Sequence, residues 1–80
     1  MEKKDDILLK IGYKLRELRK KKGYTSYENF AFDHDIPRMQ YWRLEKGKTN
    51  ITIKSLEKLL KIHQISFIEF FDFEDSQPDS

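Results

Sequence analysis

The stretch from Ala31 to Lys48, AFDHDIPRMQYWRLEKGK, constrains the fold of this chain more than any other segment. It predicts two short helices joined by a tight turn, because a polar run around Asp35 separates two segments that suit helices. Pro37 fits the start of the second helix, where a missing N–H costs nothing. This second helix ends before Gly47 and presents a mixed polar and aromatic outer face.

Two further helices are predicted N-terminal to this turn. The first runs from about Asp6 to Lys22, where a run of lysines and then Gly23 are typical of a helix C-terminus. The next helix begins near Thr25 or Ser26, and Thr25-x-x-Glu28 fits a capping box. The first helix has a core stripe at three- and four-residue spacing, formed by Ile7, Leu8, Ile11, Leu15 and Leu18.

Two more helices are predicted after Gly47. Thr52 caps one of them, and Ser66-x-x-Glu69 is a capping box that opens the other. The apolar face of the former consists of Leu56, Leu59, Leu60 and His63. The last helix carries Phe67, Phe70 and Phe71. No segment alternates in the manner of a strand, so the expected fold class is all-α with five helices.

The length of 80 residues corresponds to one domain. We expect this domain to span residues 1–71, followed by an acidic, disordered tail over residues 72–80. The chain has no cysteine, no apolar leader and no apolar run of the ~20 residues that a membrane helix needs. These features predict a cytoplasmic protein without a membrane partner.

The small net charge of +2 conceals an uneven distribution. Residues 1–22 carry nine Lys/Arg and four Asp/Glu, and residues 37–61 carry seven and two. The chain up to Phe71 therefore has a net charge of +6, whereas the tail has −4. A basic body suits a polyanionic partner, although lysine-rich helices are often only solvated faces.

The order of these features resembles the phage Cro/repressor-type (XRE-like) helix-turn-helix family between about Ile11 and Phe71. The matching elements are Arg19 and Gly23, then Ala31, Asp35-Ile36, and Leu44-Glu45-Lys46-Gly47-Lys48. The resemblance implies a five-helix lambda-repressor-like domain that binds double-stranded DNA sequence-specifically and regulates transcription. We expect a repressor.

The sequence departs from the family pattern at three places. Asp35 and Gln64 each replace a glycine, and one extra residue lies between Gly23 and Ala31. The family glycine in the turn has a left-handed backbone, which Asp tolerates better than most residues. We therefore expect a positive φ at Asp35.

Helical geometry selects the face of the helix 38–45 that can read DNA. At about 100° per residue, a buried Tyr41 places Met39 and Arg43 on the opposite side and Leu44 near the core. Gln40 and Trp42 flank these two outward residues, and Arg38 lies nearer the core side but can still reach bases or phosphate from the first turn. The family resemblance implies base contacts at Arg38, Met39 and Arg43, so the expected base-reading residues are Arg38, Met39, Gln40, Trp42 and Arg43. Arg suits guanine and Gln suits adenine in the major groove. The alternative for Met39 and Arg43 is an ordinary solvated helix face.

Trp42 has two interpretations. It either packs on the sugar-phosphate backbone or leans on the helix that Thr52 caps.

The family resemblance also implies other roles. It places phosphate contacts at Ser26, Tyr27, Lys46 and Lys48. It pairs Glu45 with Arg19 as a structural clamp between the first and third helices.

Other chemistry is not supported by the sequence. Asp33-His34-Asp35 contains potential metal ligands, but adjacent residues at a helix end point in different directions, so a polar turn is expected and no metal. No catalytic set can be assembled, and phosphate-loop and dinucleotide motifs are absent. We expect no enzyme activity and no cofactor.

One module reads only a half-site, so we expect a homodimer on a pseudo-palindrome. The expected interface is the last helix and the Phe73 region, unless its aromatic rings simply close the core. The alternative function is an antitoxin or phage accessory protein that acts mainly through a protein partner.

Overall fold

The computed structural model describes residues 6–72 of the chain, and within them it contains five helices and no strand. The helices are α1 (Asp6–Lys21), α2 (Tyr27–Asp33), α3 (Arg38–Glu45), α4 (Ile53–His63) and α5 (Phe67–Phe70). The expected all-α fold class with five helices is confirmed. Asp72 is the last described residue, so Phe73 and the rest of the acidic tail lie outside the described part.

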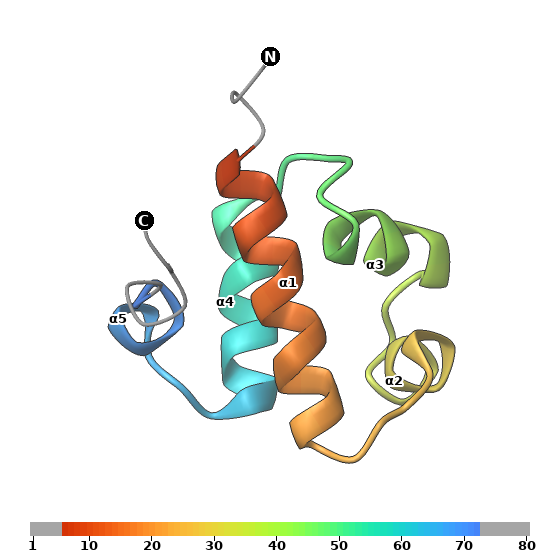
Figure 1. Cartoon of the computed structure of the whole chain (residues 1–80). Coiled ribbons are helices and arrows are strands. Elements are labelled where there is room, and N and C mark those ends of the chain that lie inside the picture. Colours follow the sequence, from red (N-terminus) through yellow and green to blue (C-terminus); the bar gives the residue numbers. More distant parts are fainter. Residues whose placement is uncertain (1–5, 73–80) are drawn as a thin grey trace.

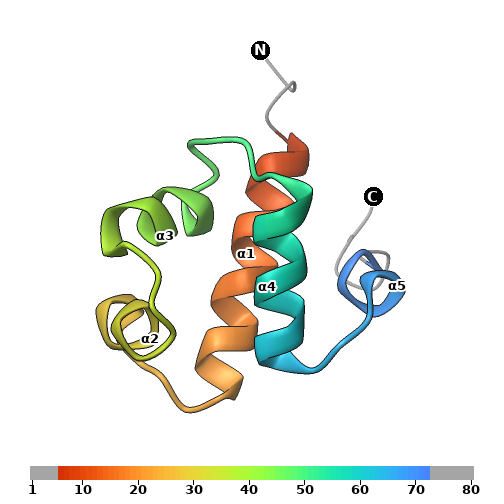
Figure 2. The same ribbon diagram turned by 180° about the vertical axis from the view of Figure 1, so that it is seen from behind.

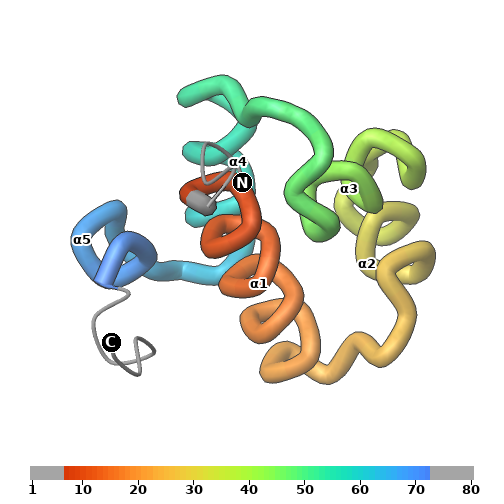
Figure 3. Tube along the Cα trace, turned by 45° about the horizontal axis from the view of Figure 1, so that its top comes forward, coloured from red at the N-terminus to blue at the C-terminus, as the bar shows by residue number. Residues whose placement is uncertain are grey.

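The two longest helices, α1 and α4, run side by side through the middle of the molecule (Figures 1 and 2). The shorter α2 and α3 lie together on one side of this pair, and α5 lies on the other (Figure 3). The α3 helix packs mainly against α1 and α2. This arrangement leaves one long face of α3 turned away from the rest of the protein.

The core lies where α1, α2, α3 and α4 meet, and α5 adds one ring to it. Its buried residues are Ile11, Leu15, Phe30, Ala31, Tyr41, Leu44, Leu56, Leu59, Leu60 and Phe70. Truncating one such buried Leu to Ala typically costs about 2–5 kcal/mol of stability. The packing of these core residues therefore determines how α3 is held. The predicted stripes on α1 and α4 therefore face the core, but at the start of α1 Ile7 is 48% exposed and Leu8 is only half-buried, outside the core.

The N-termini of the helices differ from the prediction at two positions. Ser26, not Thr25, caps α2, because its hydroxyl accepts a hydrogen bond from the Asn29 N–H at 3.2 Å. The Thr25 capping box was wrong: the half-buried Tyr24 packs against the core and places Thr25 one residue before the cap. Pro37 precedes α3 as its N-cap, since its ψ of 126° is extended rather than helical.

The other two predicted caps are present. The Thr52 hydroxyl accepts from the Ser55 N–H at 3.1 Å. Ser66 and Glu69 form the reciprocal capping box at the start of α5.

Two residues take the left-handed backbone conformation that the family glycines would adopt. Asp35 has φ 57° and Gln64 has φ 58°. The expected positive φ at Asp35 is confirmed, and with it the alignment of the α2–α3 turn. The Ile36 N–H then donates to the Ala31 carbonyl at 2.9 Å, which closes this turn.

Gly12 has a role that the sequence analysis did not identify. It is buried on α1, and a Cβ built there would lie 2.3 Å from the Glu45 carbonyl oxygen and 2.7 Å from that of Leu44. No side chain fits in that space, so the absence of a Cβ lets α1 touch the end of α3. An isolated glycine within a helical pattern is the available sequence signal for such a contact.

Candidate DNA-binding surface

The outer face of α3 consists of four exposed residues, Arg38, Met39, Gln40 and Arg43. They are held outward because Tyr41 and Leu44, on the opposite side of the helix, are buried with 0% and 6% exposure. Two guanidinium groups, an amide and a thioether therefore lie together on one helix. These groups suit the hydrogen-bonding edges and methyl groups of bases in a major groove.

The first turn of α3 differs from the starts of α2, α4 and α5. Each of those three helices has a Ser or Thr side chain that caps a backbone N–H, whereas Pro37 makes no such bond. The N–H groups in the first turn of a helix have no partner within the helix. Backbone donors and the positive end of the helix dipole thus lie beside Arg38.

Lys46 and Lys48 follow α3 directly and are both exposed. Gly47 between them has φ 69° and lies against α1, where an added Cβ would be 2.9 Å from Leu9 Cδ2. The two lysines border an open depression of about 520 Å³ that Leu8 and Leu9 also line. The turn therefore holds two cations at the end of α3.

The other residues expected at DNA are less exposed. Ser26 is half-buried, and its oxygen is already an acceptor within the α2 cap. Tyr27 is half-buried and packs against the core. Trp42 is also half-buried, unlike the fully outward Arg43. The structure thus brings together the two arginines, Met39, Gln40 and the two lysines, and sets Ser26, Tyr27 and Trp42 further back.

Arg19 and Glu45 form a bidentate ion pair that joins α1 to the end of α3. Arg19 Nε donates to Glu45 Oε2 at 2.7 Å, and Arg19 Nη2 donates to Oε1 at 3.1 Å. The two side chains retain only 6% and 5% exposure. Arg19 Nη1 also donates to the Tyr24 carbonyl at 2.9 Å, so one guanidinium links three segments.

This pair also changes the electrostatics of its surroundings. Hydrogen bonding to Glu45 raises the pKa of Arg19. Burial raises the pKa of the Tyr41 hydroxyl far above its usual value, and the neighbouring Glu45 carboxylate adds to that effect. Because Arg19 neutralises Glu45, the cations on and after α3 dominate the field outside this helix.

A cluster of rings underlies the α2–α3 turn. Phe30 packs against Tyr24, His34, Tyr41 and His63, with ring centroids 4.7–5.4 Å apart. His63, predicted on the apolar face of α4, is half-buried. His34 was expected in a polar turn, yet it is half-buried on Phe30. Among residues 6–72, no group of three or more His, Cys, Asp or Glu could hold a metal ion.

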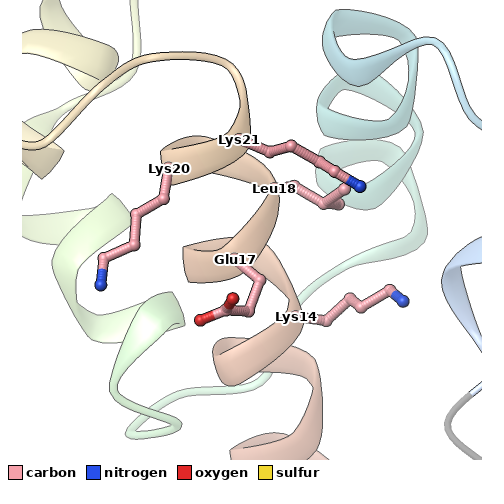
Figure 4. Close-up of a pocket in the computed structure, with 5 residues that line it drawn as sticks. All are labelled: Lys14, Glu17, Leu18, Lys20 and Lys21. Atoms are coloured by element: carbon pink, nitrogen blue, oxygen red, sulfur yellow. The ribbon is translucent and has the colours of Figure 1, made fainter. Parts of the chain in front are cut away.

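A second depression, of about 370 Å³, lies on the outer side of α1. Figure 4 shows that Lys20 and Glu17 extend to one side of the helix, whereas Lys14, Leu18 and Lys21 extend to the other. These side chains diverge and do not converge on a common point. The depression is therefore a solvated face and not a ligand site.

An exposed cationic helix held by a tight turn and a buried ion pair defines a helix-turn-helix DNA-binding protein. Comparison with known families places the chain more narrowly. Residues 15–70 match the helix-turn-helix family, and the chain belongs to this family, which is of the XRE-like type. It is a sequence-specific DNA-binding regulator of transcription, and the family consists of such regulators, not enzymes.

Two relatives share most of the chain. Control protein C.MunI of Mycoplasma sp. is 39% identical over 67 residues, which cover 84% of this chain and 90% of the relative. Control protein C.BamHI of Bacillus amyloliquefaciens is 30% identical over 69 residues, covering 86% and 85%.

Two solved structures are similar. The restriction-modification controller protein C.AhdI from Aeromonas hydrophila has a TM-score of 0.72 at 35% identity, covering 82% of this chain and 98% of its own. A variant of the controller protein C.Esp1396I has a TM-score of 0.74 at 29% identity, covering 91% and 95%. In the part of this chain that the structure describes, no helix is long and apolar enough to cross a membrane.

Proposed function

We propose that this protein controls the transcription of a restriction–modification system, as a homodimer with α3 of each copy in the major groove of an operator. The observation that carries this proposal is the outer surface of α3, where Arg38, Met39, Gln40 and Arg43 are all exposed while the buried Arg19–Glu45 pair holds the end of the helix. The relatives are control proteins, and two structural neighbours are named as controllers of this kind. Such a regulator binds DNA in the cytoplasm. It represses transcription where the operator overlaps a promoter.

In this proposal the residues on and around α3 divide into two groups. The outer face of α3 reads bases, with Trp42 at its margin, and Lys46 and Lys48 hold phosphates next to it. Ser26 and Tyr27 contribute phosphate contacts from the start of α2, where the Ser26 hydroxyl can still donate. Arg19 and Glu45 hold α3 in place without touching DNA.

The substitution Arg43→Ala tests the base-reading role. Lys48→Ala is its matched control, because it also removes one positive charge but at a proposed phosphate contact. Loss of a base contact should cost about 1–3 kcal/mol on the best site and relax the preference at one base pair. Loss of a phosphate contact should weaken all sequences evenly and reduce the log–log salt slope by about one. The best site comes from selection on a random duplex library, and fluorescence anisotropy gives the affinities over a range of salt.

Circular dichroism must show that both variants keep the fold. Unchanged base preference in Arg43→Ala would remove this residue from the reading face. A wild-type affinity that does not depend on salt would contradict phosphate binding. A tight protein complex without any DNA affinity would favour the antitoxin or accessory role instead.

A further inference from the structure

The carbonyl of Asp35 has a partner outside the α2–α3 turn. Lys58 Nζ, from the middle of α4, donates a hydrogen bond to this oxygen at 3.3 Å. Asp35 is the left-handed residue of the turn, with φ 57°. The hydrogen bond therefore ties α4 to the one strained position in the connection that aims α3.

The packing around this hydrogen bond is open. A cleft of about 200 Å³ lies between α3 and α4, with Ile36, Pro37, Gln40 and Leu44 on one side and Ser55, Lys58 and Leu59 on the other. Unfilled space beside a helix leaves its side chains without contacts on that side. The side of α3 that faces α4 is consequently less supported by packing than the side that faces α1 and α2.

The opposite end of α3 is firmly held. Arg19 binds Glu45 with two hydrogen bonds, and Gly12 lets α1 touch the last carbonyls of the helix. Because α3 is held at this end, a change in the α2–α3 turn at its other end can tilt the helix. The tilt of α3 would displace most the three residues of its first turn, Arg38 to Gln40.

We propose that Lys58 is a positioning residue for DNA reading, because it fixes the first turn of α3 through the Asp35 carbonyl. This proposal rests on the proposed function, in which the outer face of α3 contacts bases. Lys58 itself need not touch DNA. A misplacement of about 1 Å is enough to weaken a directional contact, so a support outside the interface affects specificity.

The first test uses the full chain without DNA. Lys58→Met removes the donor and retains an unbranched stem, Lys58→Arg retains a donor, and Lys61→Met removes the same charge later in α4. The readout is the amide exchange of Ile36 and Tyr41, whose N–H groups donate to Ala31 and Pro37 on the two sides of Asp35. Both amides should exchange about three- to tenfold faster in Lys58→Met, as expected when one hydrogen bond from a charged donor is lost at the surface. Unchanged exchange in this variant would overturn the proposal whatever the protein does with DNA.

The second test measures binding to the selected site and to its single-base variants. Lys58→Met should lose about three- to tenfold in affinity for the best site, with less loss on the variants read by the first turn of α3. Its salt slope should equal that of the wild type, Lys58→Arg should restore discrimination, and Lys61→Met should leave discrimination unchanged. An even loss on all sequences with a slope lower by about one would show a direct phosphate contact and overturn the positioning role. If the wild type bound no DNA, the proposed function would fail, and the exchange result would still decide whether Lys58 holds the turn.

Discussion

His63 shows how one residue couples the core to solution conditions. Its ring stacks on Phe30 with an interplanar angle of 3° and a centroid distance of 5.4 Å. Burial lowers the pKa of His63 from its ordinary 6.5 to about 4, and the positive charge of Lys22 and the nearby His34 act in the same direction. The folded protein therefore favours the neutral form of the His63 imidazole.

The sign of the resulting pH dependence follows from linkage. Between pH 6.5 and about 4 the unfolded chain binds a proton at His63 that the folded chain does not, so stability falls as the pH falls through this window. The contribution is on the order of 1–2 kcal/mol once partial exposure is allowed for. His63→Phe, which retains a ring against Phe30, should flatten this part of the pH profile in urea denaturation. A profile as steep as that of the wild type would assign the effect to other groups.

At the scale of the elements, the contact between α1 and α3 determines how the reading helix is presented. Gly12→Ala forces a methyl group against the Glu45 and Leu44 carbonyls, which are backbone atoms and cannot rotate away. Overpacking of this kind costs typically 1–3 kcal/mol, or more where backbone must move. We expect a lower free energy of unfolding and weaker DNA binding, measured by urea denaturation and fluorescence anisotropy.

Gly23→Ala is the matched control for this substitution. Gly23 has φ 102°, but nothing lies within 4 Å of an added Cβ, so only backbone strain of about 1–3 kcal/mol is expected. DNA affinity should stay close to that of the wild type, because Gly23 lies beyond the other end of α1 from the place where Gly12 touches the end of α3. Equal losses of DNA affinity in the two variants would show that the close approach at Gly12 does not control α3.

The elements were predictable because their signals are local. Capping residues such as Thr52 and Ser66, and the apolar spacing on α1 and α4, depend on neighbours within one or two turns. The pair of Arg19 and Glu45 required the family resemblance, since the two residues are 26 positions apart. Gly12 carried only the general signal of an isolated glycine within a helix. The contacts of His34 and Lys58 could not be predicted, because they depend on how closely two helices approach in three dimensions.

At the scale of the whole molecule, the proposed DNA-reading face and the proposed dimer interface are two separate surfaces. The outer face of α3 and the last helix, α5, lie on opposite sides of the α1–α4 pair (Figures 1 and 2). A two-fold axis beside α5 would keep both copies of α3 exposed. Operator half-sites are separated by about 34 Å, so such a dimer could engage both.

Ile68 provides the test of this arrangement, because it is 84% exposed in the middle of α5. Ile68→Asp adds a charge that a dimer interface would have to bury, without disturbing the core. Phe32→Asp is the matched control, since Phe32 is 83% exposed on α2, across the molecule from α5. Sedimentation should show a dimer for the wild type and Phe32→Asp and a monomer for Ile68→Asp. The monomer should lose roughly 10²-fold in affinity for a duplex with two half-sites while keeping its affinity for one. If Ile68→Asp remained dimeric, α5 would serve only to close the core with Phe70, and the two-fold contact would lie on another surface.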